Sequence, residues 1–342
     1  MPIGLTHGPS RHGGAVDEKY GASTISTPAP RDLFDYFDAL DQANSDQATG
    51  FASRILAGFE CGFLGWNGHD LLVTTRHVPH DRMAQHYATV QGLGLLTARD
   101  GLPWRHDPAL RLEVAQQAGM EVIWDLNHYD PPPNGVDHAR RCAQAADPGR
   151  PFWICPVNEP MMYPALAGMA WEHAVDMGVE MARVAKDHHP NVRVLTTDPI
   201  TGIGDRQFAA TDRLVGTGLV DIVGINYYPH TARTSLLKVL LKTWRRYGKP
   251  ILVSETSWHD GHPKHHSRHP GFNKGMWLAH VHGQIAEAEA KGVQIAGVCW
   301  YPIVDCPPWQ RPRSDSRWSH GLIRKDGSVD GALLDELRRA KI

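Results

Sequence analysis

Residues 152–160 read Phe-Trp-Ile-Cys-Pro-Val-Asn-Glu-Pro, a short apolar run that ends in an amide and a carboxylate. A run of this kind is typical of a buried parallel strand that carries polar groups at its carboxyl end. The same pattern recurs along the chain from residue 54 onward. It predicts eight strands, at 55–60, 93–99, 121–126, 152–157, 192–196, 221–226, 250–254 and 296–300.

Longer stretches with helical periodicity lie between these runs. The clearest span 107–118, 136–146, 169–188, 205–215, 235–247 and 272–291. Several strands follow helix-ending glycines, such as Gly119 and Gly292, which supports the alternation. Eight strands that alternate with helices predict an α/β fold, a (β/α)8 TIM barrel. An open doubly wound sheet is the alternative, but no glycine-rich phosphate loop follows any strand.

The barrel pattern does not use the whole chain of 342 residues. Residues 1–52 are predicted to form an N-terminal arm with a short helix at 32–44, because the first thirty are rich in Gly, Pro, Ser and Thr and lack periodicity. Residues 53–342 are assigned to the barrel.

The composition excludes several classes of protein. The net charge of −2 leaves no basic surplus for a nucleic-acid backbone or an anionic membrane. No apolar run approaches the roughly 18 residues of a membrane span, and no signal peptide is visible. The five cysteines lack zinc-binding spacing and are expected to be reduced, mostly buried thiols. We therefore expect a soluble, cytoplasmic protein with no nucleic-acid or membrane partner and no cofactor. The oligomeric state stays open.

The catalytic groups of such barrels lie at the carboxyl ends of the strands. In this chain almost every predicted strand ends in a polar or aromatic residue. These residues are Glu60, Arg99, Asn127, His128, Asn158, Glu159, Asp198, Asn226, Tyr227, Tyr228, Glu255 and Trp300. The barrel prediction therefore brings them to one face of the molecule.

Two carboxylates stand out among them. Glu159 ends the fourth predicted strand, and Glu255 ends the seventh, within Ile-Leu-Val-Ser-Glu-Thr-Ser-Trp at 251–258. We expect these two strands to face one another across the barrel, so that both carboxylates project into the same space at its carboxyl end. Cleavage of a glycosidic bond uses such a pair: one carboxylic acid protonates the leaving oxygen, and the other attacks or activates water. For a single glutamate at a strand end, a surface salt bridge is the alternative.

From about residue 54 to 327 the chain resembles glycoside hydrolase family 1 and, more broadly, the clan of retaining (β/α)8 glycosidases. Members of this clan carry the acid/base and the nucleophile on strands four and seven. The most specific matches are Val157-Asn-Glu-Pro160, Gly224-Ile-Asn-Tyr-Tyr228 and His128-Tyr-Asp-Pro131. Weaker matches are Arg99, Trp300 and Ser319-His-Gly-Leu-Ile323.

The resemblance implies a retaining β-glycosidase that hydrolyses small β-glycosides by double displacement. It makes Glu159 the acid/base and Glu255 the nucleophile, with Asn158 bound to the sugar 2-hydroxyl. Arg99 and Tyr228 would flank Glu255, where a cation and a phenol donor favour the ionised carboxylate. The residues implied in holding the sugar are Glu60, His128, Asn226, Trp300 and Trp309. The expected partner is a small glycoside substrate.

The chain also departs from the family pattern. Thr256 and Ser257 follow the nucleophile position in place of the family's Asn-Gly, and Pro308 stands where the family has a sugar-binding glutamate. Tyr129 replaces a tryptophan. These changes leave the sugar unidentified. The changes at Thr256 and Pro308 keep open a catalytically decayed barrel that only binds carbohydrate. A transglycosylase is a further alternative, because the same residues serve both reactions.

Two basic segments have no place in the resemblance. Residues 259–269 hold five histidines and Asp260, which could bind a metal. We favour a solvated loop that shapes substrate access and predict no metal. Arg311, Arg313 and Arg317 could hold a phosphate on the substrate, but a flexible surface loop is the favoured interpretation.

Overall fold

The computed structural model describes residues 51–65, 68–78, 80–309 and 318–340. The predicted arm lies outside these ranges, apart from 51–52, and so does its helix at 32–44. Among the helices in the described ranges, none has both the length and the apolar character that crossing a bilayer requires.

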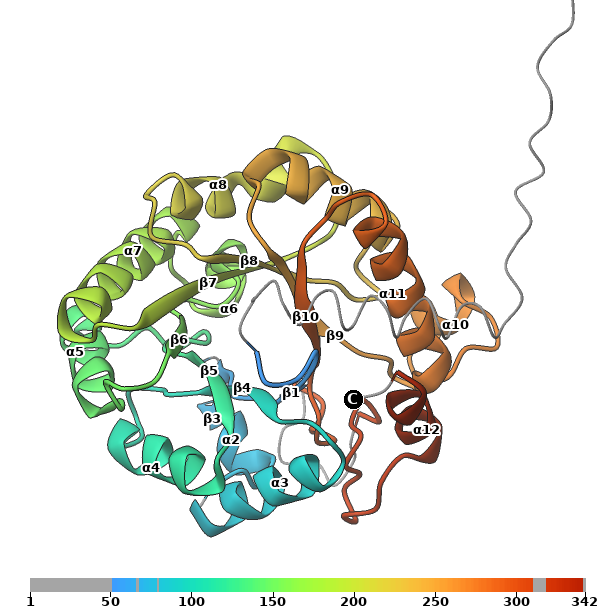
Figure 1. Cartoon of the computed structure of the whole chain (residues 1–342), viewed down its shortest axis with the longest axis horizontal. Helices are drawn as coiled ribbons and strands as arrows, with labels where there is room; N and C mark the ends of the chain where they lie inside the picture. Colours follow the sequence, from blue (N-terminus) through green and yellow to red (C-terminus); the bar gives the residue numbers. More distant parts are fainter. Residues whose placement is uncertain (1–50, 66–67, 79, 310–317, 341–342) are drawn as a thin grey trace, which may run out of the picture. The chain divides into compact units, whose positions relative to one another are not determined.

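Eight parallel strands close into a barrel, as predicted (Figure 1). Around the ring they follow the order of the sequence, and each overlaps one of the predicted runs. They are β1 (Ile55–Gly58), β4 (Thr97–Gly101), β5 (Glu121–Asp125), β6 (Phe152–Cys155), β7 (Val192–Pro199), β8 (Ile222–Asn226), β9 (Ile251–Thr256) and β10 (Ile295–Trp300). Because β1 pairs with both β4 and β10, the sheet has no open edge. This closure excludes the doubly wound sheet.

Helices form a ring around the strands (Figure 1). The longer ones are α3 (His80–Gly92), α4 (Pro108–Ala118), α5 (Gly135–Ala145), α7 (Trp171–His188), α8 (Ala209–Val215), α9 (Leu236–Tyr247), α11 (Lys274–Glu289) and α12 (Gly331–Arg339). Short turns of helix are α2 (Leu71–Thr74), η1 (Pro160–Met162), α6 (Tyr163–Leu166), η2 (Asp205–Phe208) and α10 (Pro263–Arg268).

Local sequence signals explain where several helices begin and end. Asp107 caps α4 by accepting the N–H of Ala109, and Gly119 ends it in the left-handed conformation with φ of 67°. Ser235 and Gly248 act in the same way at the two ends of α9. Such caps satisfy backbone groups that a helix leaves unpaired, which is why the predicted bounds lie close to the observed ones.

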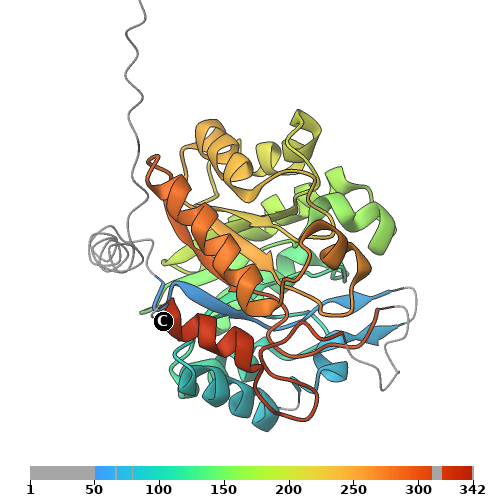
Figure 2. The ribbon, with the colours of Figure 1, turned by 90° about the vertical axis from the view of Figure 1, so that its right-hand side faces the viewer.

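Other elements differ from the sequence prediction. β4 begins at Thr97, four residues after the predicted start at 93. An antiparallel hairpin, β2 (Phe63–Leu64) with β3 (His69–Asp70), follows β1, and the pattern gave no bounds for it or for α3 and α12. Figure 2 shows this hairpin and the chain after β10 at the same end of the barrel. The hairpin and the chain after β10 both follow the carboxyl ends of their strands, so both lie at the end of the barrel where the sequence analysis places the polar residues.

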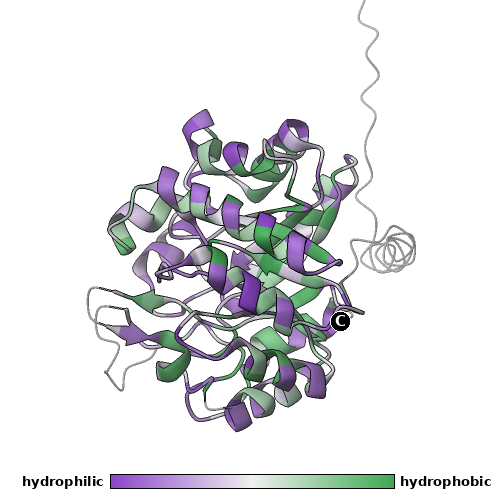
Figure 3. Cartoon of the chain, turned by 90° about the vertical axis from the view of Figure 1, so that its left-hand side faces the viewer, coloured by the Kyte–Doolittle hydropathy of each residue, from purple (hydrophilic) through white to green (hydrophobic). Residues whose placement is uncertain are grey.

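The described residues form three apolar clusters, of which the smallest contains Tyr129, Val157, Tyr163 and Ala174. The largest lies between the strands and the helices, and Figure 3 shows hydrophobic strands inside helices that carry hydrophilic residues. The second cluster contains Leu56, Ile123, Trp153, Leu195, Ile222, Leu252, Ala296, Cys299 and Tyr301, mostly strand residues. All five cysteines are buried thiols, as expected.

Candidate active site

A fully buried arginine joins the ends of several strands. The Arg99 guanidinium on β4 donates to Oε1 of Glu255 on β9 at 2.7 Å. It also donates to both carboxylate oxygens of Asp125 on β5, at 3.0 and 2.8 Å, and to Oδ1 of Asn158 at 2.7 Å. A buried charge is tolerated only when it is paired and hydrogen-bonded. Arg99 therefore holds Glu255 in a defined orientation.

Glu255 receives a second donor from the chain that follows β8. The phenol O–H of Tyr228 donates to Oε2 of Glu255 at 2.8 Å, so each carboxylate oxygen accepts at least one hydrogen bond. Donors to an ionised group stabilise its charge more strongly than donors to a neutral one. Both contacts that the resemblance implies for Glu255 are present, and they suit a carboxylate that acts as a nucleophile.

Glu159 follows β6 and lies in a different environment. Its φ of 46° lies in the left-handed region, which costs a non-glycine residue about 1–3 kcal/mol. Oε1 accepts the side-chain amide of Asn226 at 2.8 Å, and Oε2 accepts the phenol O–H of Tyr129. Burial and then the charge of Glu255 raise the pKa of Glu159 to about 7, although the two hydrogen bonds lower it. Such a carboxyl group can give and take a proton near neutrality.

Two amide side chains connect these carboxyl groups. Oδ1 of Asn158 accepts from Arg99 at 2.7 Å and from Asn226 at 3.4 Å. Asn226 donates onward to Glu159, and Arg99 donates to Glu255. The two carboxyl groups are therefore the ends of one hydrogen-bonded chain. On the ring, β7 and β8 separate their strands, so β6 and β9 face one another across only part of the barrel.

His128 and Asp125 extend the network toward β5. Nδ1 of His128 lies 3.0 Å from Oδ2 of Asp125, and Nε2 lies 2.8 Å from the amide nitrogen of Asn158. Burial would raise the pKa of Asp125, but the Arg99 charge and the His128 contacts more than offset this and lower it. An ionised Asp125 keeps the histidine proton on Nδ1. A sugar hydroxyl would then have to replace Asn158 at Nε2, so the sugar-binding roles of His128 and Asn158 stay predictions.

Glu60 lies at the carboxyl end of β1 and is only 4% exposed. Its Oε1 accepts the backbone N–H of Gly62 at 3.0 Å and the phenol O–H of Tyr301 at 3.1 Å. Burial raises the pKa of Glu60, and the nearby His128 opposes the shift. The structure thus places Glu60 beside the site, and its role in holding the sugar stays a prediction.

The two tryptophans that were predicted to hold the sugar, Trp300 and Trp309, differ in burial. Trp300, the last residue of β10, has no exposed surface, and its indole N–H donates to the carbonyl of His320 at 2.9 Å. In this arrangement its ring offers no face to a sugar. Trp309 is half-buried and lies edge-on to Tyr129, with 6.2 Å between the ring centroids. Arg311, Arg313 and Arg317 lie outside the described residues.

Several members of the network were missed by the sequence analysis. Asp125, Ser254, Thr197 and Tyr301 were assigned no role, yet Ser254 donates to Oδ1 of Asn226 at 2.7 Å and Thr197 donates to Oδ1 of Asn158 at 2.8 Å. Asp125 did carry a signal, because a lone carboxylate inside a buried apolar strand needs a cationic partner. Ser254, Thr197 and Tyr301 carried no comparable signal in the sequence.

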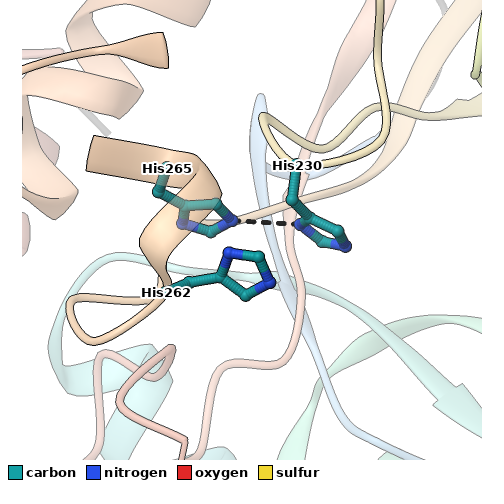
Figure 4. A group of neighbouring side chains, drawn as sticks. All are labelled: His230, His262 and His265. Carbon is teal, nitrogen blue, oxygen red and sulfur yellow. Dashed lines mark hydrogen bonds between the residues drawn. The ribbon is translucent and has the colours of Figure 1, made fainter. Parts of the chain in front are cut away.

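Three histidines from two segments of the chain, one after β8 and one at α10, lie close together (Figure 4). His230 follows β8, whereas His262 and His265 lie at the start of α10, and one nitrogen from each ring lies within 4.8 Å of the others. Nε2 of His265 lies 3.0 Å from Nδ1 of His230. The ring centroids of His230 and Tyr228 are 5.4 Å apart. The predicted solvated loop is therefore partly an ordered cluster, with His265 fully buried.

The hydrogen bonds of this cluster do not suit a metal site. The backbone N–H of His259 donates to Nδ1 of His265 at 3.0 Å, and that of Lys264 donates to Nδ1 of His262 at 3.2 Å. A neutral imidazole that accepts at Nδ1 carries its proton on Nε2. Neither Nε2 then has a lone pair for a cation, whereas metal-bound histidines usually donate from the other nitrogen. We interpret the His265–His230 contact as an N–H···N hydrogen bond.

This interpretation predicts the metal content of the protein. Untagged protein should contain far less than one zinc ion per chain by elemental analysis. Added zinc should leave its unfolding temperature unchanged, because a ligand stabilises a fold only when it binds the folded state. Stoichiometric zinc in the natural protein that disappears in a His262→Ala/His265→Ala variant would contradict it.

A second group of candidate metal ligands, Cys61, Asp125 and His128, lies within the site. Burial raises the pKa of the Cys61 thiol well above its ordinary value, whereas a metal needs the thiolate. Both oxygens of Asp125 already bind Arg99. We therefore interpret this group as part of the hydrogen-bonded network.

Comparison with known proteins gives one kind of match. No protein-family profile and no curated protein sequence matches the chain. The family 1 β-glucosidase from Thermotoga maritima superposes with a TM-score of 0.62 at 12% identity, over 86% of this chain and 97% of that one. The chain has the barrel fold of this glucosidase. Because fold alone does not determine chemistry, the side chains described above carry the functional argument.

Two further structures of the T. maritima β-glucosidase match to the same degree. The complex with glucoimidazole gives a TM-score of 0.63 at 11% identity, and the complex with castanospermine gives 0.61 at 12% identity. Each match covers 86% of this chain and 99% of the other.

Proposed function

We propose that this chain is a retaining glycosidase that hydrolyses small β-glycosides by double displacement. The observation that carries the proposal is the contrast between two buried carboxyl groups in one network. Glu255 accepts from a guanidinium and a phenol, which suits an anionic nucleophile. The pKa of Glu159 is raised to about 7 by burial and by the charge of Glu255, which suits an acid/base.

In the first step, a carboxylate oxygen of Glu255 attacks the anomeric carbon of the sugar. The bond from that carbon to the glycosidic oxygen breaks, and Glu159 gives its proton to the departing oxygen. The alcohol leaves, and the sugar stays on Glu255 as a covalent ester. Arg99 orients the attacking group throughout, because its guanidinium also binds Asp125 and Asn158.

In the second step, Glu159 is ionised and acts as a base. It takes a proton from water, the water oxygen attacks the anomeric carbon, and the ester bond to Glu255 breaks. Esterification of Glu255 removes its negative charge, which is one cause of the raised pKa of Glu159. The pKa of Glu159 should therefore fall between the two steps, in the direction that each step needs.

The intact network argues against a decayed barrel. A barrel that only binds sugar gains nothing from a fully buried arginine that orients one carboxylate, or from a second carboxyl group with a pKa near 7. Transglycosylation uses the same residues, with an acceptor hydroxyl in place of water. Product analysis with added alcohol or sugar acceptors separates the two reactions.

Stereochemistry gives the decisive test. A panel of aryl β-glycosides should release the aryl alcohol, and proton NMR of the early reaction should show the β-anomer of the free sugar first. Glucoimidazole and castanospermine, which are found in the T. maritima enzyme, serve as competing ligands. First appearance of the α-anomer would contradict the retaining mechanism. Failure to hydrolyse any member of the panel, with glucoimidazole still bound, would favour the binding barrel.

A further inference from the structure

Tyr129 is a buried side chain to which the sequence assigns no role. It follows His128 after β5 and is only 2% exposed. Its ring packs edge-on to His128, with 4.7 Å between the centroids, and lies 5.8 Å from the ring of Tyr163. With Trp309 on a further side, the ring has little freedom to move.

The phenol of Tyr129 reaches the carboxyl group of Glu159. Its O–H donates to Oε2, while the amide of Asn226 donates to Oε1 at 2.8 Å. Both Tyr129 and Glu159 are non-glycine residues with positive φ, of 65° and 46°. Strained backbone persists where the surrounding structure enforces it, and it concentrates at functional sites. Here the strain lies at both ends of one hydrogen bond.

We propose that Tyr129 is a positioning residue that fixes the Glu159 carboxyl group through its phenol hydrogen and sets the pH range in which that group exchanges its proton. The proposal rests on the glycosidase function proposed above. It also assigns a consequence to the replacement of tryptophan by tyrosine at this position. An indole can only donate, whereas a phenol can donate to the carboxylate or accept from the carboxylic acid.

The amphoteric phenol suits a residue that acts as an acid and then as a base. When Glu159 is ionised, Tyr129 donates to Oε2 and stabilises the charge. When Glu159 is protonated, the phenol can rotate so that its oxygen accepts the proton of the carboxylic acid. The amide of Asn158 lies 3.5 Å from the phenol oxygen and can donate to it. The same contact therefore serves both protonation states.

Other titratable groups also face Glu159. They are Glu255 on β9, His128 after β5, Tyr228 after β8 and Asp198 on β7. Burial raises the pKa of Asp198 to about 8, which is close to the pKa of about 7 for Glu159. Asp198 accepts from the Thr211 hydroxyl at 3.0 Å and, among the described residues, forms no hydrogen bond with the Glu159 carboxyl group. The test must therefore separate Tyr129 from Asp198.

The test compares two matched tyrosine variants. Tyr129→Phe removes the phenol and keeps the ring, so the carboxylate of Glu159 loses a donor and its pKa should rise. The pH at which kcat/KM falls on the alkaline side should then increase by about one pH unit. Tyr163→Phe is the control, because that phenol contacts the backbone of Asn127 and Tyr129 but not Glu159. In Tyr163→Phe the alkaline limb of the kcat/KM profile should stay at the same pH.

The two chemical steps give a second readout. Aryl glycosides with very good leaving groups need little acid, so the base-assisted second step limits kcat. Tyr129→Phe should lower kcat for these substrates more than kcat/KM, because the phenol no longer holds the ionised Glu159 in position for the second step. An Asp198→Asn variant should keep the Tyr129 effect. An unchanged limb in Tyr129→Phe, or an equal shift in Tyr163→Phe, would overturn the proposal.

A measurement without substrate separates this proposal from the proposed function. Carbon-13 NMR of protein labelled at the glutamate carboxyl carbon gives the titration of Glu159, assigned by its loss in Glu159→Gln. Tyr129→Phe should raise that midpoint even if no glycoside is hydrolysed. An unmoved midpoint refutes the role of Tyr129, whereas a moved midpoint without hydrolysis refutes only the glycosidase. If Tyr129→Phe does not fold, Tyr129→Trp should shift the midpoint in its place, because the larger ring cannot reproduce the phenol contact.

Discussion

Replacing Glu255 by alanine should lower kcat/KM for aryl β-glycosides by at least about 10⁴-fold, because no covalent intermediate can form. The variant should stay folded: alanine removes a buried charge but leaves Arg99 paired with Asp125 and Asn158. Circular dichroism and the unfolding temperature check this. Glu180→Ala, an exposed change on α7, is the control and should keep full activity.

Chemical rescue makes the result for Glu255→Ala specific. Azide can enter the space left by the side chain and attack the anomeric carbon directly. One displacement inverts the configuration, so the product should be the α-glycosyl azide, identified by NMR. Rescue that yields the β-glycosyl azide, or full activity without azide, would show that Glu255 is not the nucleophile.

Replacing Glu159 by alanine should have an effect that depends on the leaving group. For poor leaving groups, loss of the acid should lower kcat/KM by about 10²–10⁴-fold. For a 2,4-dinitrophenyl glycoside the first step should proceed almost normally, because that alcohol leaves without a proton. Azide should here replace water in the second step and give the β-glycosyl azide. Equal losses across all leaving groups would contradict the acid/base role.

The same variant should also change the pH profile. Burial and the charge of Glu255 raise the pKa of Glu159 to about 7. The protonated form performs the first step, so kcat/KM of the natural protein should fall as the pH rises through about 7. In Glu159→Ala this limb should disappear. A limb that persists unchanged would assign it to another group, of which Asp198 is the first to test because burial raises its pKa to about 8.

The barrel could be predicted because its signals are local. A strand such as Phe152–Cys155 needs only a short apolar run, and helix ends such as Asp107 and Gly119 need only a cap and a turn. Strand ends are local as well, which is why Glu159, Glu255, Arg99, Asn158 and Tyr228 all lie in one network. The arm at 1–52 was predicted in the same way and lies almost wholly outside the described residues.

The contacts between those ends could not be predicted from local signals. Arg99 and Glu255 are 156 positions apart, and His230 and His265 are 35 apart. No residue near Trp300 in the sequence indicates that its ring is fully buried. Burial and pairing of this kind depend on how β4, β8, β9 and β10 stand in the closed ring.

The sequence by itself therefore determined the architecture and the pair of carboxylates, because strand alternation and polar strand ends are properties of consecutive residues. Only the tertiary structure decided that Tyr129 contacts Glu159, that Asp125 pairs with Arg99, and that His230 lies beside the histidines of α10. The physical reason is that barrel closure brings distant strand ends together in a poorly hydrated space. There every polar group needs a partner, and each partner shifts the chemistry of the next.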